Sequence, residues 1–265
     1  MWLLLIGSLH MMLLWSGDIL LLYALGGLLL VLFFRLSDKV LLWLSVALLF
    51  LPVVLDFVQE FLMFDMSAPF YRAWWTEASR HGITEQNFAT WLRDAHDYPT
   101  MFAFLQQGAF ERIWEFVSGH RLPKVLALFI LGYLIGRHQL YARLSEIPLK
   151  KYFVTTLLCG LPLSAIYAYS VVSGHPWGRT VHSLLYALSV LPLAASYMTG
   201  CCLLWLNVRK GTPTLCRKIC SGMFVWFPAP GRMALSNYIM QSVCGIILFY
   251  GFGFALGTRV GLIYV

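Results

Sequence analysis

Long apolar runs separated by short polar breaks dominate this chain, and their lengths predict helices that cross a membrane. A transmembrane helix needs about 20 mostly apolar residues, and somewhat fewer where flanking side chains reach the interface. Seven runs meet or approach that length: 2–15, 19–34, 40–57, 122–136, 152–172, 181–208 and 233–254. An eighth run begins at Gly257 and is unfinished at Val265. The pattern predicts an all-α fold, a polytopic transmembrane helical bundle of about seven spans with a partial eighth.

Residues 60–121 interrupt this pattern. The segment contains eight acidic residues, counting Glu60, and no apolar run long enough to cross a bilayer. Within it, Thr100–Gly119 places apolar residues at helical spacing, which predicts an amphipathic helix in the interface or against the bundle. We therefore expect a single bundle over 1–265 that carries one extramembrane or interfacial insertion at 60–121.

The distribution of basic residues predicts the orientation of the bundle, because cytoplasmic loops are enriched in Lys and Arg. Two, four and four basic residues occur in three loops that alternate with basic-poor turns: 35–39, 137–151 and 209–222. These three loops are expected in the cytoplasm. The segment 60–121 and the Gly17-Asp18 turn are then expected outside.

Composition supports a membrane protein and excludes several other classes. Hydrophobic residues make up 60% and charged residues 12% of the chain, whereas soluble domains carry about 25% charged residues. The lipid bilayer is therefore the expected partner. The formal charge of +7 is dispersed among the loops, so no nucleic-acid surface is expected. The chain has no P-loop, GxSxG elbow, HExxH or paired-histidine motif, and no metal site is expected.

The first candidate site lies in the first polar break, where His10 precedes Asp18 in a strongly apolar region. An ionisable group at membrane depth costs roughly 2.5–3.5 kcal/mol on insertion scales. A continuous helix would hold the two residues about 12 Å apart, so they meet only if the chain reverses at Ser16-Gly17. His10 then suits general acid–base catalysis or a proton relay. The alternative is a structural role, in which Asp18 caps the second helix and His10 bonds a neighbouring one.

The second candidate site is the stretch 228–242, which opens a helix with two prolines, a glycine and Arg232. Asn237 and Gln241 follow at a spacing of four, so they share one helical face. A helix start with an arginine binds anions such as a phosphate or a pantetheine-type group. The alternative is polar contact between helices, with Arg232 reaching lipid phosphates.

Two stretches, and a weaker third, resemble the bacterial YeiB-like membrane proteins, a family defined by a domain of unknown function. The first is His10 followed by residues 14–25, LWSGDILLLYAL. The second is GRMALSNY at 231–238 with Gln241-Ser242 and LFYG at 248–251, and the third is 128–137, LFILGYLIGR. The family's earlier spans and its charged tail are not found here, so we expect a chain truncated at both ends.

The resemblance implies a location in the bacterial inner membrane and a helical pattern similar to that of membrane acyltransferases. In this hypothesis a cytoplasmic donor such as acyl-CoA supplies an acyl group to a small-molecule acceptor outside. His10 is the general base, Asp18 orients it, and Arg232, Asn237 and Gln241 bind the anionic donor. The alternatives are a proton-coupled small-molecule transporter, in which the same residues relay protons, and an inactive fragment or scaffold.

Overall fold

The computed structural model of the protein describes residues 1–210 and 228–257, and within them the regular elements are all helical. The described residues form two compact units. The first unit consists of three stretches, 1–32, 65–125 and 233–257. The second unit consists of 33–64, 126–210 and 228–232.

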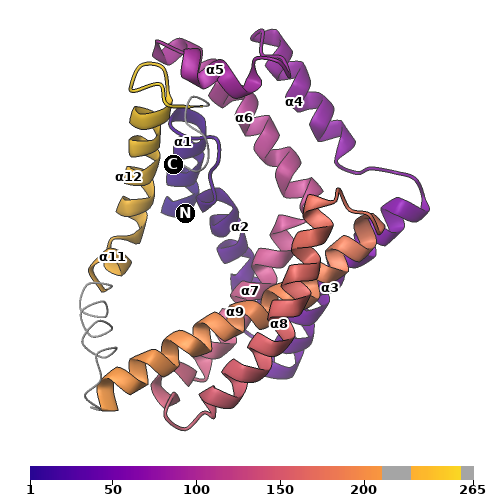
Figure 1. Ribbon diagram of the computed structural model, residues 1–265, viewed down its shortest axis with the longest axis vertical. Helices are drawn as coiled ribbons and strands as arrows, with labels where there is room; N and C mark the ends of the chain where they lie inside the picture. The colour runs from indigo at the N-terminus through magenta and orange to yellow at the C-terminus, as the bar shows by residue number, and fades with distance from the viewer. Residues whose placement is uncertain (211–227, 258–265) are drawn as a thin grey trace. The chain divides into compact units, whose positions relative to one another are not determined.

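The first unit contains six complete helices and the start of a seventh (Figure 1). They are α1 (Trp2–Leu13), α2 (Leu20–Leu30), α4 (Ala68–Arg80), α5 (Phe88–Asp94), α6 (Tyr98–Ser118), α12 (Ala234–Phe249) and the first turn of α7 (Arg121–Arg137). The α6 helix begins sharply, because the Asp97 side chain accepts the Thr100 amide at 2.8 Å. This helix confirms the one expected at 100–119 and extends it by two residues at its start.

A buried apolar cluster joins α6, α12 and the turn after α1. It is formed by Met101, Leu105, Ile246 and Tyr250, with Leu14, Trp15, Leu92 and Phe249 against them. The Trp15 and Tyr250 rings stack with their centroids 5.7 Å apart. Burial of each such side chain contributes roughly 1.5–3 kcal/mol. The cluster therefore anchors the turn that follows α1 to two other helices.

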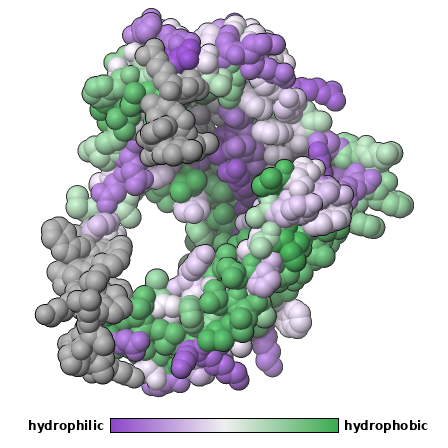
Figure 2. Space-filling view, viewed as in Figure 1, coloured by the Kyte–Doolittle hydropathy of each residue, from purple (hydrophilic) through white to green (hydrophobic). Residues whose placement is uncertain are grey.

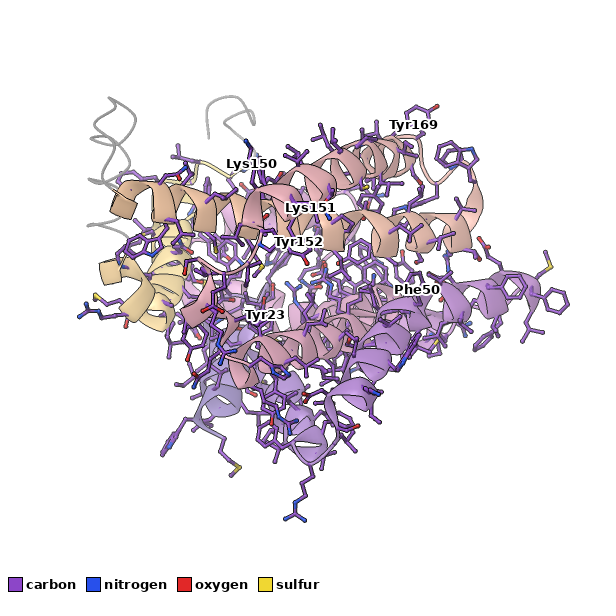
Figure 3. All side chains as sticks on the ribbon, turned by 90° about the horizontal axis from the view of Figure 1, so that it is seen from below. Tyr23, Phe50, Lys150, Lys151, Tyr152 and Tyr169 are labelled. Carbon is purple, nitrogen blue, oxygen red and sulfur yellow. The ribbon has the colours of Figure 1, made fainter. Side chains whose placement is uncertain are left out.

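The second unit is built on three long helices and shorter segments. They are α3 (Asp38–Phe61), α8 (Leu149–Val172) and α9 (Gly178–Lys210), with the rest of α7, η2 (Leu140–Arg143) and α11 (Pro228–Arg232). The short η1 (Val31–Phe33) leads from α2 into this unit. The α8 and α9 helices lie side by side (Figure 1), and a Cβ added at Gly160 would lie only 2.6 Å from the Leu193 nitrogen. Figure 3 shows Lys150 and Lys151 at the start of α8 and Tyr169 toward its other end.

Three helices are long and apolar enough to cross a membrane: Asp38–Phe61, Leu149–Val172 and Gly178–Val208. The surface of α8 and α9 is largely hydrophobic, as expected for helices that face lipid (Figure 2). The predicted number of seven spans is not confirmed, because Trp2–Leu13, Leu20–Phe33 and Ala234–Phe249 are apolar but shorter. The predicted partial eighth span and most of the basic loop 209–222 lie outside the described residues.

Two loops expected in the cytoplasm meet at one end of the second unit. Asp38 forms ion pairs with Arg137 at 3.0 Å and with His138 at 2.8 Å. Arg137 also donates to the carbonyl of Leu36 at 3.2 Å. The loops 35–39 and 137–151 therefore lie together, and their placement in the cytoplasm stays a prediction.

Candidate functional site

The first two helices approach each other closely and the chain reverses between them. A Cβ added at Gly7 of α1 would lie 2.7 Å from the Leu21 nitrogen and 3.0 Å from the Leu20 Cβ of α2. Only glycine permits this approach, because real Cβ atoms essentially never come within 3.0 Å of such atoms. His10 lies one turn after Gly7, and this places it beside Asp18.

His10 is hydrogen-bonded through both ring nitrogens. Its Nδ1 lies 3.0 Å from Asp18 Oδ1, and its Nε2 lies 2.8 Å from the Ser242 hydroxyl oxygen of α12. The three residues are buried, with 2%, 0% and 9% of their surfaces exposed for His10, Asp18 and Ser242 respectively. An ionised carboxylate only accepts hydrogen bonds, so we assign the neutral imidazole proton to Nδ1. Nε2 then accepts the hydroxyl proton of Ser242.

The same contacts accommodate a protonated imidazole. In that state Nε2 donates to the Ser242 oxygen, and the hydroxyl proton needs another acceptor. The backbone carbonyl of Tyr238 lies 3.4 Å from the hydroxyl oxygen and supplies one. The contacts can therefore hold a proton that reaches His10 from another group without leaving a buried donor unpaired.

Two groups besides His10 donate hydrogen bonds to Asp18, and one of them is itself held by the backbone. Its Oδ2 accepts the Leu21 amide at 2.7 Å, which caps the start of α2 as the sequence predicted. Tyr238 donates its hydroxyl to Oδ1 at 3.3 Å and accepts the Ile19 amide at 3.2 Å. The rings of Tyr238 and His10 lie with centroids 5.0 Å apart. These donors compensate a fully buried carboxylate for the water it has lost.

Side chains of α6 bond one carbonyl group at the end of α1 and one in the turn that follows it. The last carbonyls of a helix have no partner inside it. Tyr98 donates its hydroxyl to the Leu13 carbonyl at 3.0 Å, and Arg112 donates Nε to the Ser16 carbonyl at 3.0 Å. Gly108 lets α6 approach the Ser16 side chain closely. The reversal that carries Asp18 is thus held by α6 as well as by α12.

A group that titrates near neutral pH lies on α6 beside this support. The pKa of the Glu111 carboxyl is raised to about 7, chiefly by burial and also by the negative charge of Glu115, while Arg112 acts in the opposite direction. Arg112 itself forms an ion pair with Glu115. The charge at this position of α6 therefore changes within the physiological pH range.

The structure brings the first two predicted site residues together. His10 and Asp18 are in contact, through the chain reversal that the sequence analysis required. Asn237 and Gln241 lie on α12 but on the stripe next to the one that contacts His10, and Gln241 is exposed. Arg232 is exposed at the end of the five-residue α11 and belongs to the second unit. Donor binding by these three residues stays a prediction.

Ser242 and Tyr238 are the site residues that the sequence analysis did not select. They are four residues apart, so they share a helical face, and Ile246 and Tyr250 continue that face into the buried core. The alignment of Tyr238 and Ser242 with the apolar residues Ile246 and Tyr250 could have identified them. A polar pair on the same helical face as buried apolar residues faces the protein interior. Asn237 and Gln241 continue into Gly245 instead.

Polar residues of the second unit form contacts of their own. Ser183 of α9 donates its hydroxyl to the buried Asp56 of α3, which also accepts Gln59 Nε2 at 3.4 Å. Glu60 accepts the Arg179 amide and the Thr180 hydroxyl at the start of α9. These contacts tie the end of α3 to the start of α9. Across residues 1–210 and 228–257, no group of His, Cys, Asp and Glu is arranged to hold a metal ion.

Comparison with protein families addresses the second half of the chain. Residues 135–265 match the model of a family described as "Protein of unknown function (DUF418)". The resemblance to YeiB-like proteins is consistent with this match. No curated protein and no solved structure matches the chain significantly.

The matched residues contribute only part of the site. Ser242 and Tyr238 lie within residues 135–265, whereas His10 and Asp18 precede them by more than half the chain. Chemically, the assembled group is a hydroxyl, an imidazole and a carboxylate in hydrogen-bonded sequence. Such a sequence activates a hydroxyl group for attack on an acyl carbon.

Proposed function

We propose that this protein transfers an acyl group from a cytoplasmic acyl donor to a small-molecule acceptor at the outer side of the bacterial inner membrane. His10 is the general base that removes the proton of a hydroxyl group, and Asp18 orients it. The observation that carries this proposal is the contact of His10 Nε2 with a hydroxyl oxygen at 2.8 Å, while Nδ1 bonds a buried carboxylate.

A positive charge forms on His10 during the reaction. When His10 takes a proton it becomes an imidazolium in a nearly dry environment, where charges are screened little. The fully buried Asp18 lies 3.0 Å away and stabilises that charge. It also fixes the tautomer that leaves Nε2 free to accept a proton. A positioned base of this kind accelerates a reaction about 10²–10⁴-fold.

The acyl-transfer chemistry is further supported by the resemblance of the helical pattern to membrane acyltransferases and by three helices of spanning length. A base held by apolar helices suits a reaction between substrates on the two sides of a membrane. A thioester is a suitable donor, because its acyl carbon accepts a hydroxyl nucleophile and releases a thiol.

The test uses the full-length protein reconstituted in liposomes, with acetyl-, octanoyl- and palmitoyl-coenzyme A as donors, glycerol as the acceptor hydroxyl and release of the thiol as the readout. We expect His10→Gln to lower thiol release by at least 10²-fold. His138→Gln is the matched control, because His138 is an exposed histidine bonded to Asp38. The proposal is overturned if His10→Gln keeps the wild-type rate, or if the wild-type protein releases no thiol from any of the three donors.

The alternative is proton-coupled transport, favoured by the buried hydrogen-bonded acid and base. It predicts solute uptake that follows a pH gradient in acyl-CoA-free vesicles and is abolished by Asp18→Asn. An inactive scaffold predicts neither thiol release nor uptake.

A further inference from the structure

The proton acceptor of the site already has a hydroxyl group bound to it. His10 Nε2 lies 2.8 Å from the Ser242 oxygen, and Ser242 is 9% exposed. An acceptor molecule that needs the same nitrogen must share it with this serine. We infer that Ser242 is itself the first acyl acceptor, so that the reaction proceeds through an acyl-serine. This inference rests on the proposed acyl transfer.

The first step moves the acyl group from the donor to the protein. The Ser242 hydroxyl gives its proton to His10 Nε2 as the oxygen forms a bond to the thioester carbon. The carbon–sulfur bond breaks, and the leaving thiolate takes the proton from His10. The products are a free thiol and an ester on Ser242, and the imidazole returns to its neutral form.

The second step moves the acyl group to the acceptor. The acceptor hydroxyl gives its proton to His10 Nε2 and attacks the ester carbon. The bond to the Ser242 oxygen breaks, and that oxygen regains the proton from His10. Asp18 stays ionised in both steps, and no oxidant or reductant is required.

Among the hydroxyl groups around His10, the contacts single out Ser242. The Tyr238 hydroxyl also lies in the site, but it contacts Asp18 Oδ1 at 3.3 Å and the Ile19 amide at 3.2 Å. Its bonds therefore hold the carboxylate, and we assign it as a positioning residue. Within residues 1–210 and 228–257, Ser242 alone bonds the nitrogen that takes the proton.

A structural role for Ser242 is the competing explanation. Its hydroxyl lies 3.4 Å from the Tyr238 carbonyl, a common contact of serine in helices. A hydroxyl with only that role would need no bond to His10. Removing it would affect stability without producing or abolishing a covalent intermediate, and this difference makes the two roles separable.

The test traps the intermediate in the full-length protein in liposomes. Labelled acetyl-, octanoyl- and palmitoyl-coenzyme A are supplied without acceptor, the reaction is quenched in acid, and peptides are analysed by mass spectrometry. We expect one acyl group on the peptide that contains Ser242 and none in Ser242→Ala, whose thiol release falls at least 10²-fold. Ser242→Cys should form a thioester that neutral hydroxylamine cleaves. Ser236→Ala, an exposed serine of the same helix, should behave as wild type.

Two other results distinguish this inference from the proposed function. If Ser242→Ala releases thiol at the wild-type rate while His10→Gln does not, acyl transfer is direct and the inference is wrong. If the wild-type protein forms no adduct and releases no thiol even when glycerol is supplied as the acceptor hydroxyl, the proposed function itself fails. An acyl group found on a residue other than Ser242 also overturns the inference.

Discussion

Replacement of Gly7 by alanine tests whether the close approach of α1 and α2 builds the site. The added Cβ would lie 2.7 Å from the Leu21 nitrogen, and ordinary contacts begin at 3.4 Å. The start of α2 must therefore retreat by about 0.7 Å to remove an overlap of this kind. Leu21 donates to Asp18 Oδ2, so the carboxylate moves with it. The contact from His10 to Asp18 would lengthen from 3.0 Å to about 3.7 Å, beyond hydrogen-bond range.

Overpacking of this kind costs typically about 1–3 kcal/mol. A matched control corrects for the general effect of replacing glycine by alanine in a helix, which stabilises by about 1 kcal/mol. Gly132 of α7 has nothing within 4 Å of its added Cβ. Thermal unfolding in detergent should thus separate Gly7→Ala from Gly132→Ala by about 1–3 kcal/mol, and only Gly7→Ala should lose thiol release. Equal unfolding temperatures and equal rates of thiol release in the two variants would show that the close approach at Gly7 does not build the site.

Three further predictions concern the surroundings of the site and the second unit. The raised pKa of Glu111, about 7 against 4.5, means that the folded protein holds this proton more tightly than the unfolded chain. The stabilisation is therefore complete below pH 4.5 and is lost as the pH rises through 7. Glu111→Gln should remove that loss, as measured by thermal unfolding at pH 5 and 8. If the wild-type protein and Glu111→Gln show identical unfolding curves at both pH values, the predicted direction of the pH dependence is wrong. Arg112→Met should cost about 1.5–3 kcal/mol in denaturant unfolding, because the Ser16 carbonyl loses a charged donor and keeps only the Asp18 amide. An unchanged midpoint would exclude that role. Gly160→Leu should separate α8 from α9, since its Cβ would lie 2.6 Å from the Leu193 nitrogen, and increase cleavage by trypsin.

The helices of this protein were largely predictable from hydrophobic runs, because each run favours a helix that satisfies its own backbone. Whether the short helices cross the membrane could not be predicted from these runs. α1 has 12 residues and α2 has 11, and neither length alone distinguishes a span from a buried helix. The number of spans therefore depends on tertiary environment, which hydropathy does not contain.

The site was predictable only where its residues are close in sequence. His10 and Asp18 are eight residues apart, and Gly17 between them indicates that the chain can reverse and bring them together. Ser242 is 232 residues away from His10, and no local pattern states which helix faces which. The correct stripe of α12 depends on packing against α6, through Leu105 and Ile246.

The ¹⁵N spectrum of His10 in labelled protein in bilayers tests most directly whether His10 is a base oriented by Asp18. The His10 signals are assigned with His10→Gln. We expect a protonated Nδ1 bonded to Asp18 and an unprotonated Nε2 that accepts from Ser242. Asp18→Asn should shift the Nδ1 signal and Ser242→Ala the Nε2 signal. A protonated Nε2 that responds to neither substitution would show that His10 is not a base oriented by Asp18.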